Sequence, residues 1–146
     1  MTDPRSTPPV VISEKDQEAL CDDLVEKHDG NVIRQSQRRR SGVTVGLSDR
    51  QYYVLDHRIV FEVKAEDGKL TEDQYTLLAQ DYRANQIACC GTIDDLRVLL
   101  PAVRRSHAEG RALGWRIVQL WAARGFRREK KPSSIRSTPR PDIAPF

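Results

Sequence analysis

Residues 46–74, GLSDRQYYVLDHRIVFEVKAEDGKLTEDQ, contain the features that decide the fold of this chain. Asp49 stands just before two runs of β-forming residues, and the second run carries Glu62 and Lys64 in a segment that is otherwise built to be buried. Residues two apart in a strand project from the same face, so Glu62 and Lys64 share one face of the predicted sheet. Two interpretations are open: solvated charges on a half-exposed strand, or a site for a divalent metal ion.

The elements around this stretch predict an α/β fold. In chain order we expect a helix from Ser13 to about His28, a short strand over 31–35, two antiparallel strands over 51–56 and 58–64 with a tight turn near Asp56-His57, a helix over 72–84 that Thr71 caps, a buried strand over 86–90, a helix from Thr92 to Leu100 that Pro101 stops, and an amphipathic helix over 103–123. A strand, a helix and a further strand form a crossover unit, whose hand is nearly always right.

A chain of 146 residues is long enough for one domain with a modest core and tails. Residues 1–12 are proline-rich and aperiodic, which predicts a flexible arm, and the basic, proline-rich residues 125–146 predict a disordered tail. Between them we expect a globular domain over 13–100 and a C-terminal amphipathic helix within 101–124. Two glycines weaken this helix, and its apolar residues include Leu120.

Composition argues against several classes of protein and site. The longest apolar runs are only a few residues, and the N-terminus lacks the apolar core of a signal peptide, so we expect no membrane segment and a cytoplasmic protein. Cys21, Cys89 and Cys90 are an odd number without metal-ligand spacing, which predicts buried thiols rather than disulfides or zinc. Neither glycine-rich phosphate-binding motif is present, so no nucleotide cofactor is expected.

Charge is segregated along the chain: residues 41–100 are rich in acids, whereas residues 31–40 and 101–146 are basic. This pattern suits a protein that holds cations in one place and a polyanion around them. The arginine run at 38–40 is open to two interpretations, a solvated loop or a mobile phosphate clamp. The basic residues that we expect to contact nucleic acid are Arg38, Arg39, Arg40, Lys69, Arg127, Arg128, Lys130 and Lys131.

The acids of the opening stretch suit Mg²⁺, for which Mn²⁺ is the expected substitute. Mg²⁺ takes oxygen ligands and keeps several waters, so one or two carboxylates are enough to bind it. Asp49 and Glu62 can supply these carboxylates, and the backbone carbonyl of Val63 can supply a third ligand. A bound ion lowers the pKa of its water and stabilises charge in phosphoryl transfer. Lys64 would orient that water and neutralise developing charge, which we favour over a lysine acting as base.

The motifs G-x-S-D at 46–49, E-V-K at 62–64 and G-K-L-x-x-x-Q at 68–74 resemble the PD-(D/E)xK nuclease superfamily, and in particular the small stand-alone VRR-NUC domains. The family has a proline where this chain has Ser48, directly before the acid. Over residues 13–100 the resemblance implies a restriction-endonuclease-like core of helix, three-stranded hairpin sheet, helix and strand, to which the C-terminal helix is added.

The resemblance also implies roles for individual residues. The catalytic residues of the family fall on Asp49, Glu62 and Lys64, with Gln74 as the glutamine that opens the following helix and points into the active site. The N-terminal helix of such domains offers an additional acid. Glu18 is the candidate for it, with Glu14 as the alternative one turn earlier.

These features together predict a Mg²⁺-dependent DNA endonuclease that hydrolyses phosphodiester bonds. Branched DNA such as a Holliday junction is the candidate substrate, and the resemblance implies a homodimer that places two sites on two strands. A second hypothesis is a nucleic-acid-binding or assembly protein that uses an inactive nuclease fold. A third is a nicking or end-processing nuclease within a larger complex.

Overall fold

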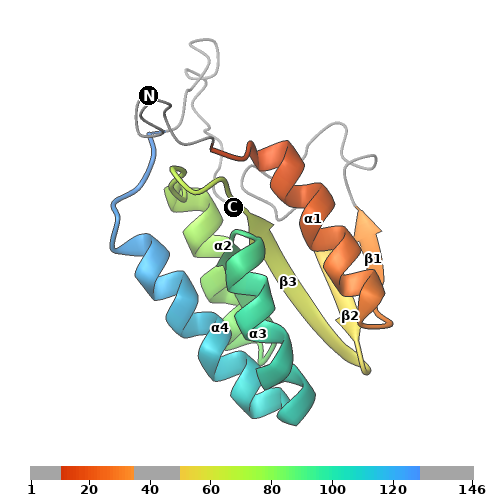
Figure 1. Cartoon of the computed structure of the whole chain (residues 1–146). Coiled ribbons are helices and arrows are strands. Elements are labelled where there is room, and N and C mark those ends of the chain that lie inside the picture. The colour runs from red at the N-terminus through yellow and green to blue at the C-terminus, as the bar shows by residue number, and fades with distance from the viewer. Residues whose placement is uncertain (1–10, 35–49, 129–146) are drawn as a thin grey trace, which may run out of the picture.

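The computed structural model describes residues 11–34 and 50–128 (Figure 1). These residues form four helices and one four-stranded sheet in the order α1 (Glu14–Lys27), β1 (Asn31–Arg34), β2 (Arg50–Val54), β3 (His57–Val63), α2 (Glu72–Arg83), β4 (Ile87–Gly91), α3 (Ile93–Arg105) and α4 (His107–Ala122). The predicted α/β class is therefore confirmed. Within these two ranges, no helix is long and apolar enough to cross a membrane.

The sheet is mixed, with strand order β1-β2-β3-β4. Neighbours β1–β2 and β2–β3 are antiparallel, whereas β3 and β4 are parallel and joined through α2. Paired residues share a face, so the pair Arg50 and Phe61 lies on one face and the pair Glu62 and Cys90 lies on the other. Figure 1 shows α1 and α3 in front of the sheet, with α2 behind α3.

Local capping signals place the first two helices as predicted. The Ser13 side chain accepts a hydrogen bond from the Asp16 backbone N–H at 3.1 Å at the start of α1, and His28 caps its end. Thr71 caps α2 and forms a capping box with Gln74. Each side chain satisfies an N–H that has no partner within the helix, which is why these positions could be found from sequence.

The turn of the β2–β3 hairpin lies one residue earlier than predicted. Its two loop residues are Leu55 and Asp56, with φ of 50° and 69°, and Val54 pairs with His57 on either side. Two-residue hairpin loops favour positive φ at both positions because their twist then matches that of the strands. Leucine is unusual in this conformation. The sequence has no glycine or asparagine here that would mark the turn.

The prediction that Pro101 stops the third helix is wrong, because α3 runs on to Arg105 with Pro101 inside it. Pro101 lies on the exposed side, whereas Ala102 and Val103 are buried. Burial of this last turn offsets the backbone hydrogen bond that proline cannot make. The next helix, α4, consequently begins at His107 rather than at 103, and the domain boundary expected at 100/101 falls inside α3.

The two glycines of α4, which were predicted to weaken the helix, allow it to make close contacts with neighbouring elements. Gly110 and Gly114 are buried, and a Cβ atom on Gly114 would lie 2.6 Å from the Ala88 carbonyl oxygen. This close approach lets α4 run along β4, the last strand of the sheet, and protect it. Leu120, one of the apolar residues noted in this helix, is 65% exposed, whereas the next residue, Trp121, is buried.

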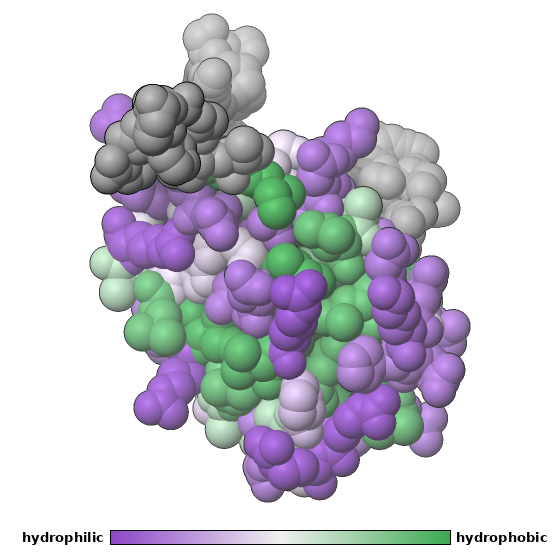
Figure 2. Space-filling view, in the orientation of Figure 1, coloured by the Kyte–Doolittle hydropathy of each residue, from purple (hydrophilic) through white to green (hydrophobic). Residues whose placement is uncertain are grey.

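Hydrophobic residues are also exposed on the surface around α3 and α4. Figure 2 shows hydrophobic residues gathered towards the middle of this face and hydrophilic residues around them. Val98 on α3 and Leu120 on α4 are the most exposed large apolar side chains of the described residues, at 56% and 65%.

The first residues of the predicted disordered tail are ordered. The Arg127 N–H donates to the Leu70 carbonyl at 2.7 Å, and the Phe126 ring lies 5.5 Å from that of Tyr75. The rest of this tail, 129–146, and the arm at 1–10 lie outside the described residues.

Substitution of Gly114 tests the contact between α4 and β4. Helix propensity alone predicts that Gly114→Ala stabilises the protein by about 1 kcal/mol. The short distance to the Ala88 carbonyl predicts the opposite, a loss of roughly 1–3 kcal/mol, because backbone must move. Urea unfolding followed by circular dichroism measures the change, with Arg116→Ala on the exposed side of α4 as the control. A gain in stability for Gly114→Ala would show that the helix does not approach β4 so closely.

Candidate active site

An acid and a lysine are buried side by side at the C-terminal end of β3. Glu62 is 4% exposed and Lys64 is 2% exposed, so the interpretation as solvated charges on a half-exposed strand is wrong. The Lys64 N–H donates to the Gly91 carbonyl at 2.8 Å, which extends the pairing of β3 with β4 by one residue. The backbone that carries both side chains is therefore held by the centre of the sheet.

Gln74 joins the first turn of α2 to this acid. Its Nε2 donates to Glu62 Oε2 at 2.9 Å, and its Oε1 accepts from the Thr71 N–H at 2.9 Å. The capping box uses the amide oxygen, so the amide nitrogen is directed at the carboxylate. The structure thus brings together Glu62 and Gln74, two residues that are twelve apart in the sequence.

The Lys64 ammonium is an uncommon group for a protein interior. Burial of a charge is costly unless it is paired and hydrogen-bonded. Within 11–34 and 50–128, the structure gives the Lys64 Nζ no hydrogen bond or ion pair, although Glu62 lies on the same face of β3.

Several predicted site residues lie outside the described residues: Asp49, Arg38, Arg39, Arg40, Lys130 and Lys131. Among the residues that are described, no cluster of three or more His, Cys, Asp or Glu side chains could hold a metal ion. The donors that the structure does describe are the Glu62 carboxylate and the Val63 carbonyl. Since the Lys64 N–H faces β4, the Val63 carbonyl points to the β2 side of β3. Both are hard oxygen donors of the type that suits Mg²⁺.

Glu18 belongs to a different group of charges, on the face of the sheet that α1 covers. Its Oε1 lies 3.1 Å from Arg50 Nη2, and Arg50 Nε donates to Asp22 Oδ1 at 3.1 Å. The Tyr52 hydroxyl donates to the same Asp22 oxygen at 3.0 Å. Arg50 and Tyr52 lie on the face opposite Glu62, so within the described residues Glu18 is placed with Arg50 and Asp22 on the α1 face.

This Asp22–Arg50–Tyr52 network was not found from the sequence. Asp22 and Arg50 are 6% and 9% exposed, so the ion pair between them is nearly buried. Burial, followed by the neighbouring Cys21 and Asp22, raises the pKa of the Tyr52 hydroxyl far above its ordinary value. The available signal was the i, i+4 spacing of Glu18 and Asp22, which puts two acids on one side of α1.

The three cysteines are free and buried, as predicted. Burial raises the pKa of the Cys21 thiol to about 12 and also raises those of Cys89 and Cys90. Asp95 and Glu62 add to the effect of burial at Cys90. A thiol with a raised pKa stays protonated at neutral pH, so none of the three is suited to act as a nucleophile or a metal ligand.

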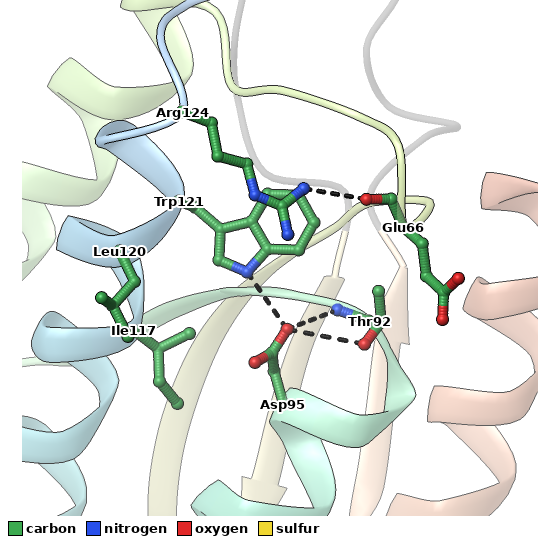
Figure 3. Close-up of a pocket in the computed structure, with 7 residues that line it drawn as sticks. All are labelled: Glu66, Thr92, Asp95, Ile117, Leu120, Trp121 and Arg124. Atoms are coloured by element: carbon green, nitrogen blue, oxygen red, sulfur yellow. Dashed lines mark hydrogen bonds between the residues drawn. The ribbon is translucent and has the colours of Figure 1, made fainter.

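A pocket of about 420 Å³ lies near the ends of β3 and β4 (Figure 3). The residues that line it are Glu66, Thr92, Asp95, Ile117, Leu120, Trp121 and Arg124. Asp95 Oδ2 accepts hydrogen bonds from Trp121 Nε1 at 3.1 Å and from the Thr92 N–H at 3.0 Å. Glu62, Lys64 and Gln74 do not line this pocket.

Comparisons of this chain with protein-family models, with curated proteins and with solved structures found no match. The family resemblance of the sequence motifs therefore stays a prediction. Function has to be inferred from the residues of the site and their geometry.

Removal of Asp22 should destabilise the protein more than removal of an exposed acid. Asp22→Ala removes the carboxylate oxygen that accepts hydrogen bonds from the buried Arg50 Nε and from the Tyr52 hydroxyl. We therefore expect the free energy of unfolding, measured in urea, to fall by about 3 kcal/mol. Asp94→Ala removes an exposed partner of Arg97 and should cost less than about 1 kcal/mol. Equal losses in the two variants would contradict a structural role for the buried network.

The thiols should resist alkylation as long as the protein is folded. At pH 8 we expect iodoacetamide to leave all three cysteines unmodified, because burial both shields them and raises their pKa values. In concentrated urea all three should react, and mass spectrometry of the intact chain counts the adducts. Rapid labelling of the folded protein would mean that the core around β4 opens readily.

Proposed function

We propose that this protein is a metal-dependent endonuclease that hydrolyses phosphodiester bonds in DNA at the group Glu62, Lys64 and Gln74. The observation that carries the proposal is a buried carboxylate and a buried ammonium on one face of β3, with the Gln74 amide hydrogen-bonded to the carboxylate. A restriction-endonuclease-like core is part of the proposal. The order α1-β1-β2-β3-α2-β4 supports it, because it agrees with the order of elements that the sequence motifs imply.

The metal in this proposal is Mg²⁺, with Mn²⁺ as its substitute. Glu62 and the Val63 carbonyl would hold it, together with Asp49, which lies outside the described residues. When bound, such an ion lowers the pKa of a coordinated water and stabilises charge on the phosphoryl oxygens. Because Mg²⁺ keeps several waters, this small set of oxygen ligands is enough.

The protein side chains would divide the remaining tasks. Gln74 donates to one carboxylate oxygen of Glu62 and so fixes the rotation of the carboxylate. Lys64, on the same face, would donate hydrogen bonds to the attacking water and to the scissile phosphate. Its burial strengthens both interactions, since they are exchanged less readily for contacts with bulk water.

Exposed basic residues close to the β3–α2 connection would hold the DNA backbone. Lys69 lies in that connection, next to Leu70, whose carbonyl accepts the Arg127 N–H at 2.7 Å. Lys69, Arg127 and Arg128 are exposed and are brought to one place, although they are far apart in sequence. Phosphate contacts of this type orient DNA without reading its sequence. Branched DNA as substrate, a homodimer with two sites and action in the cytoplasm complete the proposal.

Cleavage assays on variants of the two buried charges test the proposal. Glu62→Gln and Lys64→Met keep the size of each side chain and should lower the cleavage rate by about 10²- to 10³-fold, because each removes a charge that acts in the transition state. The assay uses labelled four-way junction, flap and duplex DNA with Mg²⁺, Mn²⁺ or a chelator. Glu26→Gln, an exposed acid on α1, is the matched control and should cleave at the normal rate.

Thermal melting of each variant separates loss of function from loss of fold, and Gln74→Ala, at a partly exposed position, provides a third variant. Undiminished cleavage by Glu62→Gln and Lys64→Met would refute the assignment of the site. Glu18→Gln tests the additional acid: a role in the ion pair with Arg50 predicts normal cleavage per folded molecule.

The exposed group Lys69, Arg127 and Arg128 also fits the second hypothesis, a nucleic-acid-binding or assembly protein without catalysis. That hypothesis predicts binding that weakens steeply with salt, needs no metal and leaves every DNA intact. Nicks in one strand or shortened ends, without paired cuts in a junction, would instead favour a nicking or end-processing nuclease of a larger complex.

A further inference from the structure

The loop between β3 and α2 connects the proposed catalytic residues. Residues 65–70 follow Lys64 directly and lead to Thr71, whose capping box with Gln74 directs the amide at Glu62. The loop therefore links the end of β3 that carries Lys64 to the capping box that orients Gln74. The loop is closed by only one turn bond of its own, from the Gly68 N–H to the Ala65 carbonyl at 2.9 Å.

The chain that leaves α4 holds this loop at three carbonyl groups. Arg124 Nη1 donates to the Glu66 carbonyl at 2.8 Å and to the Gly68 carbonyl at 3.2 Å. The Arg127 N–H donates to the carbonyl of Leu70, whose side chain is fully buried. Three carbonyls of this loop are thus bound by residues that follow α4.

Arg124 is itself held in place by a series of contacts that leads back to the sheet (Figure 3). Its guanidinium carbon lies 3.5 Å from the centroid of the Trp121 ring, which is 3% exposed. The Trp121 Nε1 donates to Asp95, and Asp95 accepts from the Thr92 N–H directly after β4. The planar guanidinium can stack on the indole and donate in its own plane to the loop, which the ammonium of a lysine cannot do.

We propose that Arg124 is a positioning residue for the proposed nuclease reaction: through the β3–α2 loop it holds Lys64 and Gln74 in register with Glu62. This inference rests on the proposed function of the site. It makes α4 and the residues after it part of the active centre, although the motifs that resemble a nuclease end before them. Arg124 acts through the loop carbonyls, so its loss changes the rate of the chemical step more than the binding of DNA.

The test compares Arg124→Ala and Arg124→Lys with Arg116→Ala, which alters an exposed arginine within α4 to which the described structure gives no hydrogen bond or ion pair. We expect Arg124→Ala to lower kcat by roughly 10- to 10²-fold, because misplacement of about 1 Å can cost 10²-fold in rate. Its KM for labelled junction DNA should change by less than about threefold. Arg124→Lys should recover part of kcat, since it keeps a donor for the loop, and Arg116→Ala should equal the unaltered protein.

Hydrogen exchange of residues 65–70 and thermal melting are measured on the same samples. If the inference is right, Arg124→Ala loses kcat and its loop exchanges hydrogen faster, while the folded fraction stays unchanged. The positioning role would be overturned if Arg124→Ala kept a normal kcat, changed only in KM, or lost rate only in proportion to its unfolded fraction. Each of these results would leave the proposed function intact. Absence of cleavage by the unaltered protein with either metal would overturn the proposed function, and this inference with it.

Discussion

Burial of two opposite charges at the end of β3 is the constraint on which the rest of the structure depends. Glu62 and Lys64 are almost inaccessible to solvent, and the sheet that buries them offers mainly apolar neighbours. Such charges need polar partners from outside the strand. The first is Gln74, and it can serve only because the capping box of α2 turns its amide nitrogen towards Glu62. The position of α2 is therefore set by electrostatics as well as by packing.

The two faces of the sheet differ in how their charged residues are paired. On the α1 face, Arg50 is shared by Glu18 and Asp22, so positive and negative groups compensate one another within the network. On the α2 face, Lys64 has no such hydrogen-bonded partner among the described residues. The α1-face network fixes the start of β2 at Arg50, the residue directly after Asp49 in the chain. A structural ion-pair network on one face thus supports the strand that leads into the proposed site on the other.

Sequence signals found those parts of the fold that local interactions determine. Ser13 and Thr71 begin helices because each satisfies an N–H group only three residues away. The end of α3 could not be found in this way, because burial of Val103 outweighs the local preference of Pro101. The same holds for the site. Glu62 and Lys64 follow from the alternation of a strand, whereas the partner of Glu18 depends on the packing of α1 against β2.

A chain that needed β3 only as scaffold would gain little from charges at 62 and 64. Burial of a charge is costly unless it is paired and hydrogen-bonded, and apolar residues of similar volume avoid this cost. The positions themselves suit apolar residues, since Val60, Phe61 and Val63 beside them are buried in the core. What these residues add is a buried carboxylate and a buried ammonium on one face of β3, and in a medium of low dielectric constant each would act more strongly on a bound phosphate, as the proposed function requires, than it would in water. The proposed function gives these two charges a reason, and the contacts of Gln74 with Glu62 and of Arg124 with the β3–α2 loop would keep them in register.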